Sequence, residues 1–260
     1  MSGKILVITG LEKSFGGLRA ISELDLSVAV GKIQAVIGPN GAGKTTLFNL
    51  ITGVLTPTRG ELLFSGKKLN GRKPHQIAGM GISRTFQNVE LFAHMTALEN
   101  VMLGRHSRLQ TDIFRAGFRL PGMRREEREC RERALAELHF MGLAEKAALD
   151  ALSLPLGEQK LLEVARALAT EPKLLLLDEP AAGLNPRDTA QLSETILKIR
   201  ERGITILLVE HDMNLVMEIS DIVSVLNYGR KIAEGSPREI QRNPEVIAAY
   251  LGEEGNGASA

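Results

Sequence analysis

The stretch that constrains this chain most is a glycine-rich turn at residues 38–46. It reads Gly-x-x-x-x-Gly-Lys-Thr, which is the P-loop pattern. A short apolar run at residues 34–37 precedes it with strand character, and residues 46–51 follow with helical spacing. Glycines let backbone N–H groups approach phosphate oxygens, and the helix start and a lysine add positive charge. Rather than a glycine-rich turn without a ligand, the pattern predicts a nucleoside triphosphate site formed by Gly38, Pro39, Asn40, Gly41, Ala42, Gly43, Lys44, Thr45 and Thr46.

The composition excludes several classes of protein. The 260 residues are 43% apolar and 24% charged with a formal net charge of +1, so no overall attraction to nucleic acid is expected. Trp is absent and there are two Tyr, which disfavours stacking of single-stranded bases. No apolar run approaches a membrane span, and the first residues lack the apolar core of a signal peptide. The lone Cys130 excludes an internal disulfide, so we expect a cytosolic protein in which this thiol has no chemical role.

Short strands are expected around the P-loop in the first part of the chain. Residues 5–9 and 23–28 predict two strands, and the strict alternation of the second is typical of a half-buried antiparallel strand. Between them, Phe15 precedes two glycines; taken alone, its ring is expected in the core, although a turn there would bring it near the surface. Further elements are expected as a strand at 61–64, a helix at 74–79 and a strand at 82–86 that ends at Gln87.

The middle third reads as a helical insertion. Helical patterning begins at Thr96 and continues to Leu149, with a break at residues 117–122 where Gly and Pro are frequent. Arg and Glu interleave over residues 124–133. We interpret this run as a solvated helix face, and a partner-binding surface is the alternative.

The last part of the chain alternates buried strands with helices. Four leucines precede Asp178 and Glu179, which is typical of a buried parallel strand with two acids at its carboxyl tip. A second such strand, residues 204–209, ends just before His211. The remaining elements are expected as a helix entered at 154–159, a helix from Asn185 to Gly203, strands at 222–226 and 231–233, a helix at 244–251 and a disordered tail from Gly252.

Three apolar segments therefore end in polar chemistry, at the P-loop, at residues 178–179 and at His211. Ligands of doubly wound sheets lie at the carboxyl ends of strands, so one common site is expected. Phosphoryl transfer to water needs a metal, an oriented water and charge stabilisation beside the phosphate cradle. Asp178 is predicted to hold Mg²⁺ with Thr45, Glu179 to be the general base, and His211 to donate to the γ-phosphate. Gln87 is either a contact to Mg²⁺ or water, or a plain loop residue.

The ordered motifs resemble those of ABC-transporter ATPases over nearly the whole chain. They are the P-loop, Gln87, the signature-like residues 154–159, residues 174–179, the D-loop-like residues 182–185 and His211. A closer resemblance, to ATPase subunits of branched-chain or hydrophobic amino acid uptake systems, rests on residues 83–89, 181–186, 210–213, the insertion after Gly104 and residues 249–252. It implies ATP and Mg²⁺ as cofactors, with Phe15 stacked on adenine and Gln87 in the Q-loop beside the metal.

The fold that we expect is α/β. It has a P-loop NTPase core, a mostly parallel sheet flanked by helices, with an N-terminal antiparallel β part and a helical subdomain. Residues 1–251 are predicted to form a single ABC ATPase domain, and residues 252–260 a disordered tail. Its parts are a core at about 1–86 and 160–235, the helical subdomain with its insertion at 88–158, and a C-terminal helix at 236–251.

The resemblance further implies a head-to-tail dimer, with itself or with a second ABC ATPase. Each ATP would contact one P-loop and, in trans, Gly157 and Glu158 of the other chain, with Asn185 nearby. The chain departs from the general signature at Pro155, Leu156 and Glu158, so the usual serine hydroxyl is missing while the Gly157 N–H remains. Asn185 also replaces the usual aspartate of the D-loop.

The other implied partners are membrane permease subunits and, indirectly, a solute-binding protein, with this chain on the cytoplasmic face of the inner (plasma) membrane and no nucleic acid bound. Leu91, Phe92 and Met95 follow Gln87 without a regular period. They either pack beneath the insertion or line a groove for a permease helix. The alternatives are the ATPase of a urea-uptake or lipopolysaccharide-export system, or a soluble ABC ATPase without a transport role. The solute itself is not determined by the sequence.

Overall fold

Two β-sheets organise the fold, and the computed structural model describes residues 3–105 and 121–254. The first sheet has the order β2-β1-β4-β5 and is antiparallel. The second has the order β10-β9-β3-β8-β7-β6 and is parallel except for β10. The strands are β1 (Lys4–Phe15), β2 (Leu18–Ala29), β3 (Ile33–Ile37), β4 (Arg59–Phe64), β5 (Lys67–Lys68), β6 (Ile82–Arg84), β7 (Leu174–Asp178), β8 (Thr205–Val209), β9 (Ile222–Asn227) and β10 (Arg230–Gly235).

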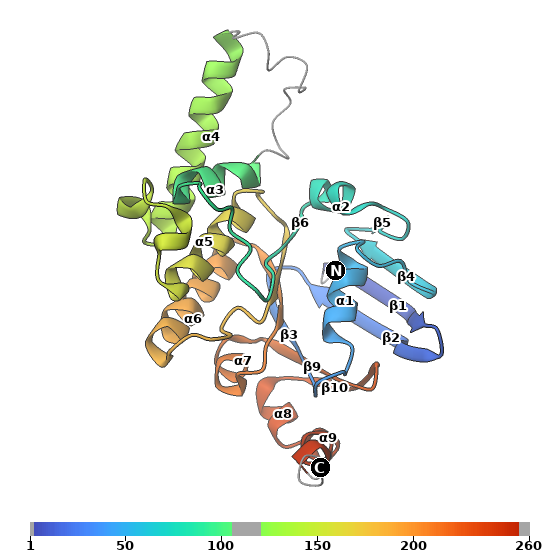
Figure 1. Ribbon diagram of the computed structural model, residues 1–260. Helices are drawn as coiled ribbons and strands as arrows, with labels where there is room; N and C mark the ends of the chain where they lie inside the picture. The colour runs from blue at the N-terminus through green and yellow to red at the C-terminus, as the bar shows by residue number, and fades with distance from the viewer. Residues whose placement is uncertain (1–2, 106–120, 255–260) are drawn as a thin grey trace.

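The helices fall into groups around these sheets. In Figure 1, α3, α4 and α5 gather at one end, α4 projects away from the sheets, and α8 and α9 lie at the other end beside the C-terminus. The helices are α1 (Lys44–Ile51), α2 (Pro74–Met80), α3 (Ala97–Arg105), α4 (Pro121–Phe140), α5 (Leu156–Leu168), α6 (Pro186–Glu201), α7 (Met213–Ile219), α8 (Pro237–Gln241) and α9 (Pro244–Glu254), with short 3₁₀ turns at Ala144–Lys146 and Ala151–Ser153. None of the helices in the described ranges is long and apolar enough to cross a membrane.

Strand β7 shows why the sheet needs an uninterrupted leucine run. Successive side chains of a strand point to opposite faces. Leu175 and Leu177 pack in the cluster that contains α5 and α6, whereas Leu174 and Leu176 pack in the cluster that contains α1 and the antiparallel sheet. All four are completely buried. Both faces of the parallel sheet are therefore covered, which is the arrangement expected for such a sequence.

Several element bounds differ from those expected. The strand expected to reach residue 86 ends at Arg84, and the first two strands are longer than the alternating runs that revealed them. The single helix expected at 236–251 is two helices, α8 and α9, because Ser236 begins a first capped helix with a proline at its first position. Helix α9 continues to Glu254, so the predicted tail does not begin at Gly252. Residues 255–260 lie outside the described residues.

The helical middle of the chain agrees with the pattern of the sequence where it is described. Helix α4 includes Gly122, so the expected break does not extend to that residue, and residues 106–120 lie outside the described ranges. Between residues 127 and 133 only Cys130 is buried, which is compatible both with a solvated face and with the alternative of a partner-binding surface. The Cys130 thiol packs α4 against α3 with a contact to the Met102 carbonyl oxygen, 3.8 Å away.

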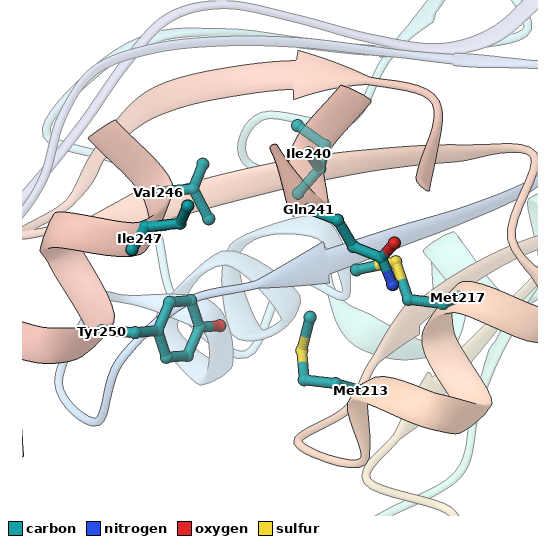
Figure 2. Close-up of a pocket in the computed structure, with 7 residues that line it drawn as sticks. All are labelled: Met213, Met217, Ile240, Gln241, Val246, Ile247 and Tyr250. Atoms are coloured by element: carbon teal, nitrogen blue, oxygen red, sulfur yellow. The ribbon is translucent and has the colours of Figure 1, made fainter. Parts of the chain in front are cut away.

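An apolar groove lies between α7 and the α8–α9 pair. Figure 2 shows the side chains of Met213 and Met217 on one side, with Tyr250 across from them. Ile240, Gln241, Val246 and Ile247 complete the lining. The first residue of α7 lies two positions after His211, so the groove adjoins the loop that carries this histidine.

Candidate functional site

The P-loop follows β3, and steric contacts require two of its glycines. Gly38 has a φ of 151°, and a Cβ atom there would lie 2.1 Å from the carbonyl oxygen of Leu226 in β9. Gly43 has a φ of 103°, and a Cβ atom there would lie 2.7 Å from the carbonyl oxygen of Ala20 in β2. Only glycine fits such positions. The loop is therefore wedged between two strands, and α1 begins directly after it at Lys44.

The side chain of Lys44 is drawn into this loop. It is 6% exposed, and its Nζ donates to the carbonyl oxygens of Gly38 (2.6 Å) and Pro39 (2.9 Å). A buried ammonium group needs such partners. The charge is thereby held against the turn, which is the place where a P-loop binds phosphate.

A pocket at the P-loop brings the predicted nucleotide residues together. It is lined by Phe15, Leu18, Ala20, residues 40–46, Glu179 and His211. Phe15 is 45% exposed, so the core position expected from its local sequence is wrong. The ring lies at the end of β1, where the turn to β2 carries it to the rim of the sheet. Its place in the pocket agrees with the role that the family resemblance implies.

Glu179 is the centre of a hydrogen-bonded trio at the strand ends. Its Oε2 accepts from Gln87 Nε2 at 2.8 Å, and its Oε1 lies 2.9 Å from His211 Nε2. The backbone of Glu179 has a φ of 47°, a left-handed conformation that is costly for a residue with a side chain and is often found at functional sites. Three of the four predicted catalytic residues thus meet, the fourth being Lys44 in the P-loop, but Gln87 contacts Glu179 rather than Thr45 or Asp178.

Asp178 has a partner that the sequence did not reveal. Its carboxylate, at the end of β7, accepts from Nη2 of Arg84 at 2.7 Å, and the exposed fractions of the two side chains are 4% and 8%. Nη1 of Arg84 donates to Asn49 Oδ1 on α1 at 2.7 Å, and the guanidinium lies over the Phe48 and Phe86 rings. The available signal was an arginine at the end of a short strand of the sheet. Arg84 therefore joins the acidic strand tip to the P-loop helix.

The residues expected to act in trans lie outside the described lining of the P-loop pocket. Glu158 accepts from Lys146 at 2.5 Å. A Cβ atom on Gly157 would lie 2.7 Å from Asp188 Oδ2, so this glycine packs directly against α6. Asn185 caps that helix, because its side chain accepts from the backbone N–H of Asp188 at 3.0 Å. Within one chain, Gly157, Glu158 and Asn185 therefore make local contacts around α5 and α6.

Comparison with known proteins identifies the family. The family model described as "ABC transporter" matches residues 21–182, which is more than half of the chain. The chain belongs to the ABC transporter family. A second model of this family, described as "Branched-chain amino acid ATP-binding cassette transporter", matches residues 230–256.

Individual members of the ABC transporter family are similar over nearly the whole chain. The sequence is 48% identical to the high-affinity branched-chain amino acid transport ATP-binding protein BraF of Pseudomonas aeruginosa, over 97% of this chain and 100% of that protein. It is 47% identical to LivG of Escherichia coli strain K12 with the same coverage. A crystal structure of a nucleotide-free ATP-binding cassette from an ABC transporter matches with a TM-score of 0.83 at 32% identity, covering 95% of this chain and 99% of that chain.

Membership of the family confirms two predictions from the sequence. The protein is an ABC transporter ATPase that binds ATP. Its fold is the expected ABC ATPase fold, with an antiparallel N-terminal sheet, a mostly parallel sheet with helices and a helical subdomain. The P-loop pocket, bounded by Lys44, Phe15, Glu179 and His211, is accordingly its candidate ATP site.

Proposed function

We propose that this ABC ATPase powers the uptake of branched-chain amino acids from the cytoplasmic face of the inner (plasma) membrane. The match at residues 230–256 carries the proposal, because that segment lies beyond the general ABC match; its described residues, 230–254, contain β10, α8 and α9. The names of BraF and LivG support the same solute class. The proposed partners are permease subunits on separate chains and, through them, a solute-binding protein.

In the proposed ATP complex the P-loop carries the phosphates. The ammonium group of Lys44 already lies against carbonyl oxygens of the P-loop. On ATP binding, Lys44 exchanges these contacts for contacts to the β- and γ-phosphates. Residues 38–46 supply backbone N–H groups and the start of α1. Phe15, half exposed at the pocket rim, stacks on the adenine.

The residues present fit a bound Mg²⁺. Thr45 is exposed at the start of α1, and Asp178 lies buried at the end of β7 with one oxygen, Oδ2, held by Arg84. Mg²⁺ is commonly bound by one or two protein ligands together with phosphates and water, so a complete protein cage is not needed. We propose that Thr45 and the second oxygen of Asp178 hold the ion, with Gln87 reaching it after a rearrangement. When bound, Mg²⁺ supplies positive charge to the phosphate oxygens.

The Glu179 trio lies where the proposed general base is needed. Oε2 of Glu179 accepts from Gln87 and Oε1 lies beside His211 Nε2, so an attacking water would share an oxygen with one of these partners. We propose that His211 turns to the γ-phosphate when ATP binds, because its side chain is 44% exposed and lies in the same pocket. Glu179 Oε1 then accepts a proton from the attacking water.

Two chains complete each site in this proposal. The P-loop pocket has no described lining from residues 156–158, and Gly157 faces α6 of its own chain. A head-to-tail partner, either the same chain or a second ABC ATPase, would bring Gly157, Glu158 and Asn185 to the exposed side of the nucleotide. The backbone N–H of Gly157, at the start of α5, is the group proposed to contact the γ-phosphate.

The proposed permease contact lies after Gln87. Phe92 is 52% exposed, and the guanidinium carbon of Arg166 lies 5.6 Å from its ring centre. Leu91 instead packs partly buried against the core cluster of the helical subdomain. We therefore assign the interface to Phe92 and a packing role to Leu91.

Substitution of Glu179 tests the catalytic assignment. Glu179→Gln keeps the shape but not the basicity, so turnover should fall by roughly a hundredfold or more while ATP binding remains. The variant should also form an ATP-dependent dimer that does not reopen. Lys44→Ala is the contrasting variant and should lose ATP affinity. Near-normal turnover by Glu179→Gln would contradict the assignment of Glu179 as the general base.

Reconstitution tests the solute class. The chain is assembled in proteoliposomes with the permease subunits that co-purify with it, and ATPase stimulation is measured with the matching solute-binding protein. Leucine, isoleucine and valine should stimulate hydrolysis, and urea should not. Stimulation by urea alone, or co-purification with lipopolysaccharide-export components, contradicts the proposed transport function.

A further inference from the structure

A buried lysine lies directly beneath the catalytic trio. Lys160, on α5, is 5% exposed, although lysine is almost never fully buried unless it is paired. Its Nζ donates to the backbone carbonyl oxygens of Glu179 at 3.3 Å and Gln87 at 3.4 Å. One ammonium group therefore joins the main chain of two catalytic residues that are far apart in the sequence.

A buried carboxylate, that of Glu210, binds the main chain of the third catalytic residue, His211. Glu210 is 3% exposed and lies between β8 and His211. Its Oε2 accepts from the backbone N–H groups of His211 at 2.8 Å and Asp212 at 3.2 Å, and its Oε1 accepts from Ala181 at 2.6 Å. The loop of His211 is thus tied to the loop that follows Glu179.

A contribution to stability alone does not account for the buried charges of Lys160 and Glu210. Burial lowers the pKa of Lys160, while the carboxylates of Glu163, Glu210 and Glu179 oppose that shift. Even a buried ion pair often adds little net stability, because the desolvation of the charges offsets their attraction. What an apolar side chain cannot supply is the set of directed contacts to the two loops.

We infer that Lys160 and Glu210 are positioning residues for ATP hydrolysis. They fix the main-chain positions of Gln87, Glu179 and His211 relative to one another. The inference rests on the proposed role of these three residues. It extends that role to α5, because Lys160 lies one turn after Gly157, the residue proposed to contact the partner's ATP. The helix that would meet the partner's nucleotide thereby touches the catalytic loops of its own chain.

Two substitutions of Lys160 separate hydrogen bonding from packing. Lys160→Met keeps much of the length but donates no hydrogen bond, so kcat should fall at least about tenfold while the Kd for ATP changes less than about twofold. Lys160→Gln is one bond shorter but can still donate to one carbonyl, so it should recover part of the lost kcat. Lys198→Met, on the exposed surface of α6, is the matched control and should leave kcat, Kd and thermal stability unchanged.

Glu210→Gln tests the positioning role of Glu210 with the same measurements of kcat, Kd and thermal stability. Glutamine keeps only one oxygen acceptor, so one of the two loops loses its anchor and kcat should fall with little change in Kd. All rates are normalised to the folded fraction. If Lys160→Met does not fold, Lys160→Gln and Glu210→Gln decide the matter by their split between kcat and Kd.

Three results overturn the inference. They are normal kcat in folded Lys160→Met, equal loss in Lys160→Met and Lys160→Gln, and losses that only follow the folded fraction. Glu179→Gln is measured in the same assay. If it retains turnover, the proposed catalytic function fails; if it is inactive while the Lys160 and Glu210 variants are normal, only the positioning role fails.

Discussion

Removal of Arg84 should destabilise the protein more than any surface substitution, because it leaves the Asp178 carboxylate buried without its partner. The pair has an Nη2–Oδ2 distance of 2.7 Å, and its side chains are 8% and 4% exposed. Breaking a buried pair of this kind costs about 3–5 kcal/mol. At about 2 °C per kcal/mol for a domain of this length, Arg84→Met should lower Tm by about 6–10 °C in the absence of nucleotide.

Unfolding in urea and differential scanning calorimetry measure this loss. Asp178→Asn and the double variant complete the cycle, and the double variant should be more stable than Arg84→Met because no unpaired charge remains. The exposed pair of Lys198 and Glu194 is the control, for which either single substitution should cost under about 1 kcal/mol. A loss below about 1 kcal/mol in Arg84→Met, or strict additivity in the cycle, refutes the reasoning.

Two further predictions concern the segment after Gln87 and the ion pair between Arg105 and Glu171. Leu91→Ala should lower the free energy of unfolding by about 1–2 kcal/mol, because Leu91 is only partly buried, whereas the exposed Phe92→Ala should cost less than about 1 kcal/mol. With reconstituted permease, Phe92→Ala should lose solute-stimulated ATPase but keep basal ATPase, and preserved stimulation contradicts its interface role. Arg105 donates to Glu171 and lowers the pKa of this carboxyl from 4.5. The ion pair of Arg105 with ionised Glu171 therefore stabilises the folded state fully above pH 4.5, and this stabilisation is lost as the pH falls through the folded-state pKa of Glu171. The stability gap between wild type and Glu171→Gln in urea should therefore close at acidic pH, and a gap independent of pH contradicts this prediction.

Much of the fold was predictable because its signals are local. The leucine run of β7 required cover on both faces, and the structure provides it. The cap and proline at Asn185 and Pro186 located the start of α6. The outcome at the C-terminus has an equally local cause: the helix expected at 244–251 agrees with the start of α9, whereas residues 237–241, expected in the same helical unit, form the separate helix α8 behind the Ser236 cap.

The candidate site was predictable in its residues but not in its contacts. Strand ends in the sequence indicated Glu179 and His211, and the pocket contains both. The local sequence of Phe15 favours the core, whereas the family resemblance predicts a place at the nucleotide, and the exposed ring in the pocket agrees with the second. Gln87 was expected near a metal, yet its amide donates to Glu179 in this structure.

The sequence by itself determined the phosphate-binding turn, the buried strands and the identity of the acids at their tips. Each of these follows from backbone sterics or side-chain periodicity within about ten residues. The tertiary structure alone decided which charges are paired. Arg84 meets Asp178 because β6 pairs with β7 in the register that places Arg84 opposite Leu176. Lys160 reaches Gln87 and Glu179 only because α5 packs beneath both loops. Such contacts join residues that are distant in the chain, so no local pattern encodes them.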